Sequence, residues 1–510
     1  MRPTLLACLF LVSCQKASPK KLPPPADYLG VISVASLDGA AARLDAYLQA
    51  ITPGVKTGLT GRTAEVPLAM LVSARSLDGL AFDKPMHLVG LDPKKFPRPF
   101  VLVGTVVDQK KLAAAVDEKN LKVQGGRALI GVKDAVDAVE AWAMASLTEA
   151  PEAPTLRLDL ARLVERYRPE IEGLRKQMAP LFASQPMMAK VFDVEIDILT
   201  RVAAQTQELT LAIDADAKEA HLEVAMIPRP GTTLEAFGKA QALAKLDLLE
   251  KIPGVAGADY VLVGNYRLGP VRDAFYELMG GVMEGMLGAP IDAAFKKRWD
   301  AMLDHFVGPM ASASRFQPTG GMSFAQIVEV DDAARAAADI KALFPLPAPR
   351  TFEVMGMKMT LELHEGVATH QGTSIDEYSL ALDFGSLPPQ QQEMFRMMYG
   401  DKLHLVMAGK GKFLYMTWGK DAVAAVAPLL DGASGTPSPA AKAALSAAIG
   451  RRASFAMFMN LAGAVAAMTG RAAPATSGIS FEMSFPDATS RLRIGVPAAH
   501  VRELQGLVPR

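Results

Sequence analysis

The sequence predicts an α+β protein of two similar lobes, each with a mostly antiparallel sheet and helices packed on it. Three observations lead to this prediction. The chain has 510 residues, more than one hydrophobic core usually serves. Apolar residues alternate strictly over residues 209–213 and 222–226, which is typical of a hairpin with one buried face. The same succession of strands and helices then recurs in the second half of the chain.

The first half alternates short strands with helices. Val, Ile and Tyr favour a strand at 27–34, and an alanine-rich helix follows at 37–51. Proline and glycine make 52–67 a loop. The elements expected next are a buried strand at 100–107, a helix at 109–116, a strand at 128–132, a helix at 133–145, a strand leading into a helix at 155–164, and the hairpin at 209–226.

The second half repeats this order. The matching pairs of segments are 26–28 with 258–260, 100–107 with 322–330, 133–139 with 420–426, 155–164 with 453–465, and 209–226 with 479–496. Matches that keep one order indicate an internal duplication. Pro and Gly cluster at 252–257, so we expect lobe 1 to cover 27–251 and lobe 2 to cover 252–510, with an inserted β region near 346–386.

Composition describes a globular protein without a nucleic-acid partner. Hydrophobic residues make up 50% of the chain and charged residues 21%, so there is ample material for a core. Lys plus Arg and Asp plus Glu each number 54, and this balance gives no overall field that would attract nucleic acid.

The N-terminus has the layout of a secretory signal. Arg2 gives a positive start, residues 4–12 are mostly apolar and too few to span a bilayer, and Leu11-Val12-Ser13-Cys14 ends the segment. These four residues resemble the lipobox of bacterial lipoproteins. The resemblance covers only the leader, and it implies that residues 1–13 are removed as a signal peptide and that Cys14 is lipidated.

Residues 14–26 follow as a Pro- and Lys-rich tether. Beyond Cys14 no apolar run reaches the length of a membrane span, so the lipid is the expected membrane anchor. Gln15 stands after the cysteine. Under the best-known sorting rule for lipoproteins, this residue implies the outer membrane, with the protein facing the periplasm or the cell surface.

The body of the chain contains no complete catalytic or cofactor motif. There is no Gly-x-Ser-x-Gly elbow, no dinucleotide or phosphate loop, and no Cys pair for zinc. We therefore expect no cofactor and no catalytic activity. A hydrolase whose site is assembled from distant residues remains the alternative.

A second alternative is soft-metal binding. Met355, Met357 and Met359 alternate along a predicted strand, and His364 and His370 follow. Thioethers on one face of a strand suit Cu(I). Methionine is also a common filler of irregular cores, and the chain has 26 methionines, so core packing is the preferred interpretation.

The function expected from the sequence is binding or scaffolding in the cell envelope, with an apolar ligand or an envelope protein as partner. One amphipathic stretch, 291–307, places apolar residues at helical spacing. It is expected to cover a sheet, and a membrane surface or a partner protein are the alternatives.

Overall fold

The structure is a computed structural model, and it describes the chain from residue 22 to residue 507. The gaps in this description are 56, 179, 181–185, 278–279, 281–291, 318–320, 344–348, 355–356, 386 and 472–475. The predicted signal peptide, Cys14 and most of the tether therefore lie outside the described residues.

The fold is α+β with antiparallel sheet, as predicted. All the strand pairings of the described residues are antiparallel. The chain divides into two compact units, here called unit 1 (1–45 and 58–158) and unit 2 (46–57 and 159–510). The boundary predicted near residue 252 follows the repeated sequence pattern instead, and it stays a prediction.

Unit 1 has a sheet whose two faces are both covered. The strands pair in the order β6–β1–β2–β3–β5–β4. On one face Leu88, Leu102 and Ile130 share a core with side chains of α3 and α4, and on the other Val89 and Leu129 pack against α5. The elements are β1 (Tyr28–Val34), the first part of α2 (Leu37–Ile51), α3 (Glu65–Leu71), β2 (Met86–Leu91), β3 (Phe100–Thr105), α4 (Gln109–Ala115), β4 (Leu121–Gln124), β5 (Arg127–Ile130), α5 (Lys133–Ser146) and β6 (Thr155–Leu158); residues 46–51 of α2 belong to unit 2.

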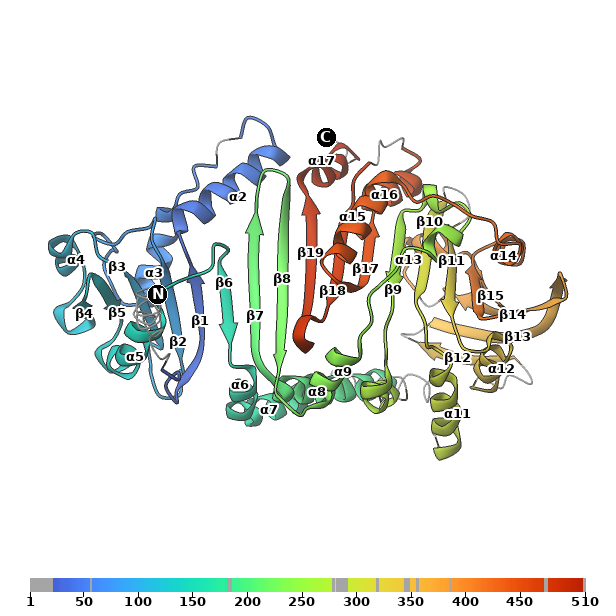
Figure 1. Cartoon of the computed structure of the whole chain (residues 1–510), viewed down its shortest axis with the longest axis horizontal. Coiled ribbons are helices and arrows are strands. Elements are labelled where there is room, and N and C mark those ends of the chain that lie inside the picture. The colour runs from blue at the N-terminus through green and yellow to red at the C-terminus, as the bar shows by residue number, and fades with distance from the viewer. Residues whose placement is uncertain are drawn as a thin grey trace, which may run out of the picture. The chain divides into compact units, whose positions relative to one another are not determined.

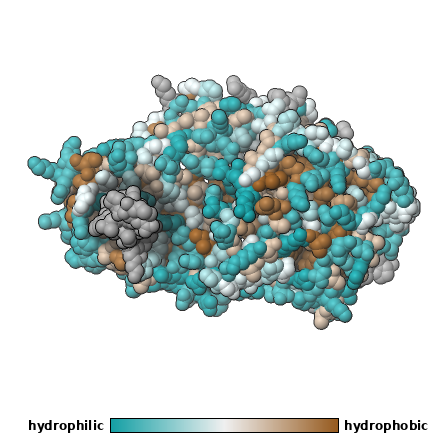
Figure 2. Space-filling view, viewed as in Figure 1, coloured by the Kyte–Doolittle hydropathy of each residue, from teal (hydrophilic) through white to brown (hydrophobic). Residues whose placement is uncertain are grey.

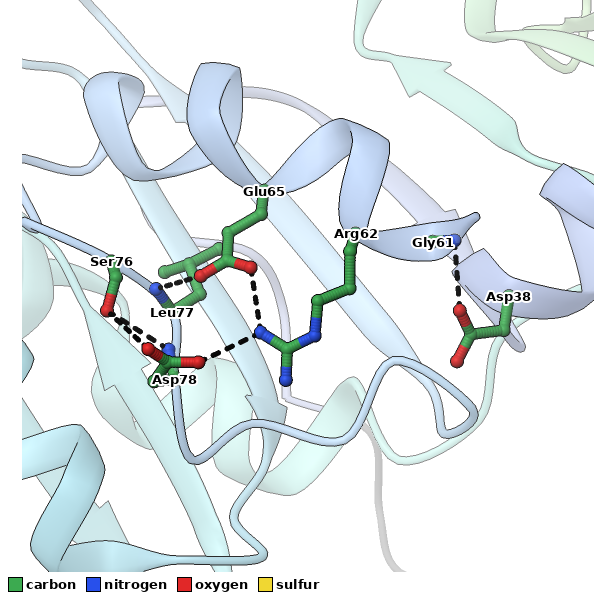
Figure 3. A network of polar contacts seen from close by, with 7 residues as sticks. All are labelled: Asp38, Gly61, Arg62, Glu65, Ser76, Leu77 and Asp78. Atoms are coloured by element: carbon green, nitrogen blue, oxygen red, sulfur yellow. Dashed lines mark hydrogen bonds and ion pairs between the residues drawn. The ribbon is translucent and has the colours of Figure 1, made fainter. Parts of the chain in front are cut away.

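Polar contacts fix the segment before α3, most of which the sequence presents as a loop (Figure 3). Arg62 forms ion pairs with Glu65 at 2.7 Å and with Asp78 at 3.0 Å. The Asp38 carboxylate accepts a hydrogen bond from the Gly61 amide at 2.9 Å. The last part of the predicted loop is therefore a 3-10 turn, Gly61–Ala64, that leads directly into α3.

Unit 2 contains one continuous ladder of strands (Figure 1). Their order is β7–β8–β19–β18–β17–β9–β10–β11–β16–β15–β14–β13–β12. The strands are β7 (Thr206–Ala215), β8 (Glu219–Pro228), β9 (Tyr260–Gly264), β10 (Met310–Gln317), β11 (Gly321–Glu329), β12 (Arg350–Val354), β13 (Met357–His370), β14 (Thr373–Asp383), β15 (Lys402–Lys410), β16 (Phe413–Trp418), β17 (Ala453–Met459), β18 (Ile479–Ser484) and β19 (Ser490–Pro497).

Helices cover both faces of this ladder in its middle part, from β9 to β16. Ile327 points to the face covered by α14 and α15, whereas the next residue, Val328, points to the face covered by α12. The helices of unit 2 are α6 (Leu160–Arg166), α7 (Arg168–Met178), α8 (Pro186–Gln205), α9 (Thr233–Ala240), α11 (Ala293–Asp304), α12 (Ala333–Leu343), α13 (Pro389–Tyr399), α14 (Ala422–Leu430), α15 (Pro439–Gly450), α16 (Leu461–Thr469) and α17 (Ala498–Leu507). Within the described ranges, no helix combines the length and the hydropathy needed to cross a membrane.

Candidate functional site

The structure separates two of the residues singled out for soft-metal binding, Met359 and His364. Met359 lies on the face of β13 that carries Leu361 and Leu363, which pack against a core cluster, and His364 points to the opposite face. Met355 lies outside the described residues, and Met357 belongs to β13. The described residues therefore do not bring Met359 and His364 to one point.

The two histidines of this stretch have carboxylate partners instead. The Nε2 of His364 lies 3.2 Å from the Glu362 carboxylate, and the Nε2 of His370 lies 2.6 Å from Asp431. Within the described ranges, no three or more His, Cys, Asp and Glu side chains are grouped in a way that could hold a metal ion.

A serine and a histidine that the sequence leaves far apart meet in unit 1. The Nδ1 of His87 lies 2.8 Å from the Ser33 hydroxyl, across the β1–β2 pairing. Both residues are at most 1% exposed. Burial, followed by the charges of Arg127 and Arg157, lowers the pKa of His87 to about 4. The pair is closed to solvent, so its geometry favours a structural role over nucleophilic catalysis.

The most suitable place for a ligand is a pocket in unit 2, called here the β9–α11 pocket. Its volume is about 390 Å³, which falls in the range of small-molecule sites. Its walls come from three parts of unit 2: the segment that follows β9, the end of α11, and the first residues of β10 with part of β11. The lining residues are Tyr266, Arg267, Leu268, Gly269, Pro270, Arg272, Leu303, Asp304, Phe306, Val307, Gly308, Met310 and Val328.

Hydrogen bonds fix the wall that follows β9. The side-chain amide of Gln241 accepts a hydrogen bond from the Arg267 amide and donates one to the Arg267 carbonyl, each at 3.0 Å. Asn265 donates its backbone N–H to Ser454 at 2.8 Å and its side-chain amide to Leu243 at 3.0 Å. This wall is therefore held in place before any ligand arrives.

A histidine between two aspartates fixes the opposite wall. His305 ends α11, and its ring nitrogens lie 2.6 Å from Asp331 and 2.8 Å from Asp339. Burial lowers the pKa of His305, but the hydrogen bonds and charges of the two carboxylates outweigh burial, so its pKa is raised. The imidazolium form donates from both nitrogens, and this anchors the turn that carries Phe306 and Val307.

The two arginines of the pocket differ in their charge partners. Arg272 is paired with Asp304 through one terminal nitrogen, and its Nε lies 3.8 Å from Asp300. Arg267 is half-buried and has no ion-pair partner within the part of the chain that the structure describes. The pocket thus combines apolar walls with one positive charge, that of Arg267, which has no ion-pair partner among the described residues.

Sequence reasoning did not predict this pocket, although a stretch that it singled out as amphipathic contributes to one wall. The amphipathic stretch 291–307 contains α11, whose Phe295, Trp299 and Met302 are buried. Arg267 carries a weak signal at most, as a lone cation placed soon after a buried apolar strand and before a Gly-Pro turn.

A second, smaller hollow of about 290 Å³ lies between β10, β11 and the start of α14. Its cations, Arg315 and Lys420, are both exposed. Water already solvates such side chains, so this hollow is a weaker candidate than the β9–α11 pocket.

Comparisons with protein-family models, with curated proteins and with solved structures give no match to this chain.

Proposed function

We propose that the protein is a lipid-anchored protein of the bacterial cell envelope that binds an apolar ligand and does not catalyse a reaction. The leader and Cys14 support the location in the cell envelope, and the outer membrane is the proposed membrane. The observation that carries the binding role is the β9–α11 pocket, which has apolar walls held on both sides by hydrogen bonds.

The visible surface of unit 2 favours a pocket over a broad docking face for a partner protein. Figure 2 shows hydrophobic residues on the viewed side, broken into small areas among hydrophilic ones. Surfaces that dock proteins usually offer a larger contiguous apolar patch. On the viewed face, a partner protein therefore ranks behind a small apolar ligand.

We also infer that the chain arose by duplication. In unit 1 the strands follow the order β6–β1–β2–β3–β5, and in unit 2 the order β17–β9–β10–β11–β16. β1, β3 and β6 fall in segments matched with β9, β11 and β17, whereas β2 and β10 share a place in the order without a matched segment. Two sheets that share strand order and the same matched segments support a common origin. The pocket lies in the second copy.

Membrane attachment is tested by expressing the chain in a bacterial host beside its Cys14→Ala variant. The wild-type protein is expected to lose residues 1–13, gain acyl mass and sediment with membranes, because several acyl chains anchor a protein stably. The variant should keep its unmodified mass and leave the membrane fraction. If the wild type and the variant both keep their unmodified mass and fractionate alike, the proposed location in the cell envelope is contradicted.

The binding role is tested with 1-decanol as a neutral apolar probe, by isothermal titration. Val307→Trp places a bulky side chain at the pocket wall, at a position where Val307 is 43% exposed. The affinity for decanol should fall at least tenfold. Val66→Trp, at a 68% exposed position of α3, is the matched control and should not change it. No saturable binding, or equal loss in both variants, would contradict the role.

A further inference from the structure

We propose that the ligand of the β9–α11 pocket is an amphipathic anion, whose acidic head group pairs with Arg267 while its apolar body lies between Leu303, Phe306 and Met310. This inference rests on the proposed binding function and adds the chemistry of the ligand to it. It follows from the charges that line the pocket and from the way each is held.

The charges of the lining do not balance. The ionisable side chains among the lining residues are Arg267, Arg272 and Asp304, so two positive charges face one negative charge. Asp304 is already engaged by Arg272, which Asp300 also approaches. The positive charge left over belongs to Arg267.

Arg267 is a half-buried residue, and its guanidinium has no ion-pair partner among the described residues. Where burial removes hydration from a charged group, a carboxylate or phosphate partner normally offsets the loss. The Arg267 backbone is held on both sides by the Gln241 amide, so the side chain projects from a fixed point. An acidic ligand would supply the missing partner through paired N–H···O bonds.

The remaining lining fits the body of such a ligand. Leu268, Pro270, Leu303, Phe306, Val307, Met310 and Val328 present apolar surface around the pocket. A ligand with a long apolar body and one acidic head satisfies both parts of the lining, whereas a purely polar anion leaves the walls without contact. Carboxylate and phosphate monoester heads share this chemistry.

The test uses residues 14–510 with Cys14→Ala, expressed without the leader, so that neither acyl chains nor detergent compete for the pocket. Four probes with the same alkyl chain are titrated: decanoate, decyl phosphate, 1-decanol and decylammonium. Decanoate and decyl phosphate should bind at least tenfold more tightly than decanol, and decylammonium more weakly than decanol. The tighter of the two anions identifies the head group.

Arg267→Gln should bring both anions to the affinity of decanol and leave decanol itself unchanged. Lys297→Gln, which removes an exposed positive charge from α11, is the matched control and should preserve the preference for anions. If decanol binds but the anions gain nothing, or if Arg267→Gln keeps their advantage, the head-group inference is wrong and the binding role stands. If no probe binds, the proposed function itself is contradicted.

Discussion

At the scale of single residues, the histidines make stability depend on pH in opposite ways. His87 has a folded-state pKa of about 4, below the ordinary value near 6.5 for an unfolded chain. The unfolded state therefore binds more protons between these values, and stability falls as pH is lowered through that window. The Leu147 backbone works against this shift as a hydrogen-bond partner, but burial and the charges of Arg127 and Arg157 outweigh it.

Acidification from pH 7.5 to pH 4.5 should lower the free energy of unfolding by about 2 to 3 kcal/mol through His87 alone. Urea unfolding of the wild type is compared at the two pH values with that of His87→Asn, which cannot gain this charge. The free energy of unfolding should fall by about 2 to 3 kcal/mol more in the wild type than in the variant between these two pH values. An NMR titration of the His87 imidazole checks the pKa directly, and a value near 6.5 would refute the explanation.

The contribution of His305 to the pH dependence of stability has the opposite sign, because its folded-state pKa is raised. Its stabilising contribution is complete below the unfolded value near 6.5 and disappears as pH rises through the raised folded value. His305→Gln should cost roughly 2 kcal/mol at pH 6, since it removes charge-assisted hydrogen bonds to Asp331 and Asp339. The cost should shrink at pH 9. His221→Gln, on β8, is the control, and an equal cost at both pH values would count against an imidazolium.

At the scale of elements, the turn between α11 and β10 depends on one close approach. A Cβ added to Gly308 would lie 2.5 Å from the Cβ of Glu329, closer than two such atoms can come. The same turn carries Val307 and places Met310 at the pocket. The backbone there has no room for a side chain, so β10 would have to shift.

Gly308→Ala should therefore destabilise the protein by about 1 to 3 kcal/mol and weaken decanol binding together with stability. Gly269→Ala is the matched control, because Gly269 lines the same pocket and an added Cβ would meet nothing within 4 Å. Thermal unfolding and titration of both variants provide the measurement. If both variants have the same stability and the same affinity for decanol, the close approach of Gly308 to Glu329 does not determine the stability of this turn.

Elements of this kind could be predicted where the determining signal is local. The helix expected at 37–51 has the bounds of α2, and the alternation at 209–226 is the β7–β8 hairpin. The pocket could not be predicted, because its walls depend on contacts between distant segments, such as the hydrogen bonds from Gln241 to Arg267 and from His305 to Asp339. The spacing of residues along the chain does not predict such long-range contacts.

At the scale of the whole molecule, the two units should respond differently to acid. His87 is the histidine of unit 1, and its lowered pKa makes that unit acid-sensitive. In unit 2 two effects oppose each other, since the pKa of His305 is raised whereas burial, its largest influence, lowers the pKa of His500. Unit 2 should therefore change less in stability between pH 7.5 and pH 5.

Differential scanning calorimetry of the mature chain should show this as two transitions that move apart at pH 5. The unit 1 transition is expected to fall by roughly 5 to 10 °C, because about 2 kcal/mol is lost from a unit of this size. His87→Asn should abolish that movement and leave the unit 2 transition where it was, which assigns each transition to its unit. A single transition that shifts equally in wild type and variant would mean that the units unfold together and that His87 does not control the acid response.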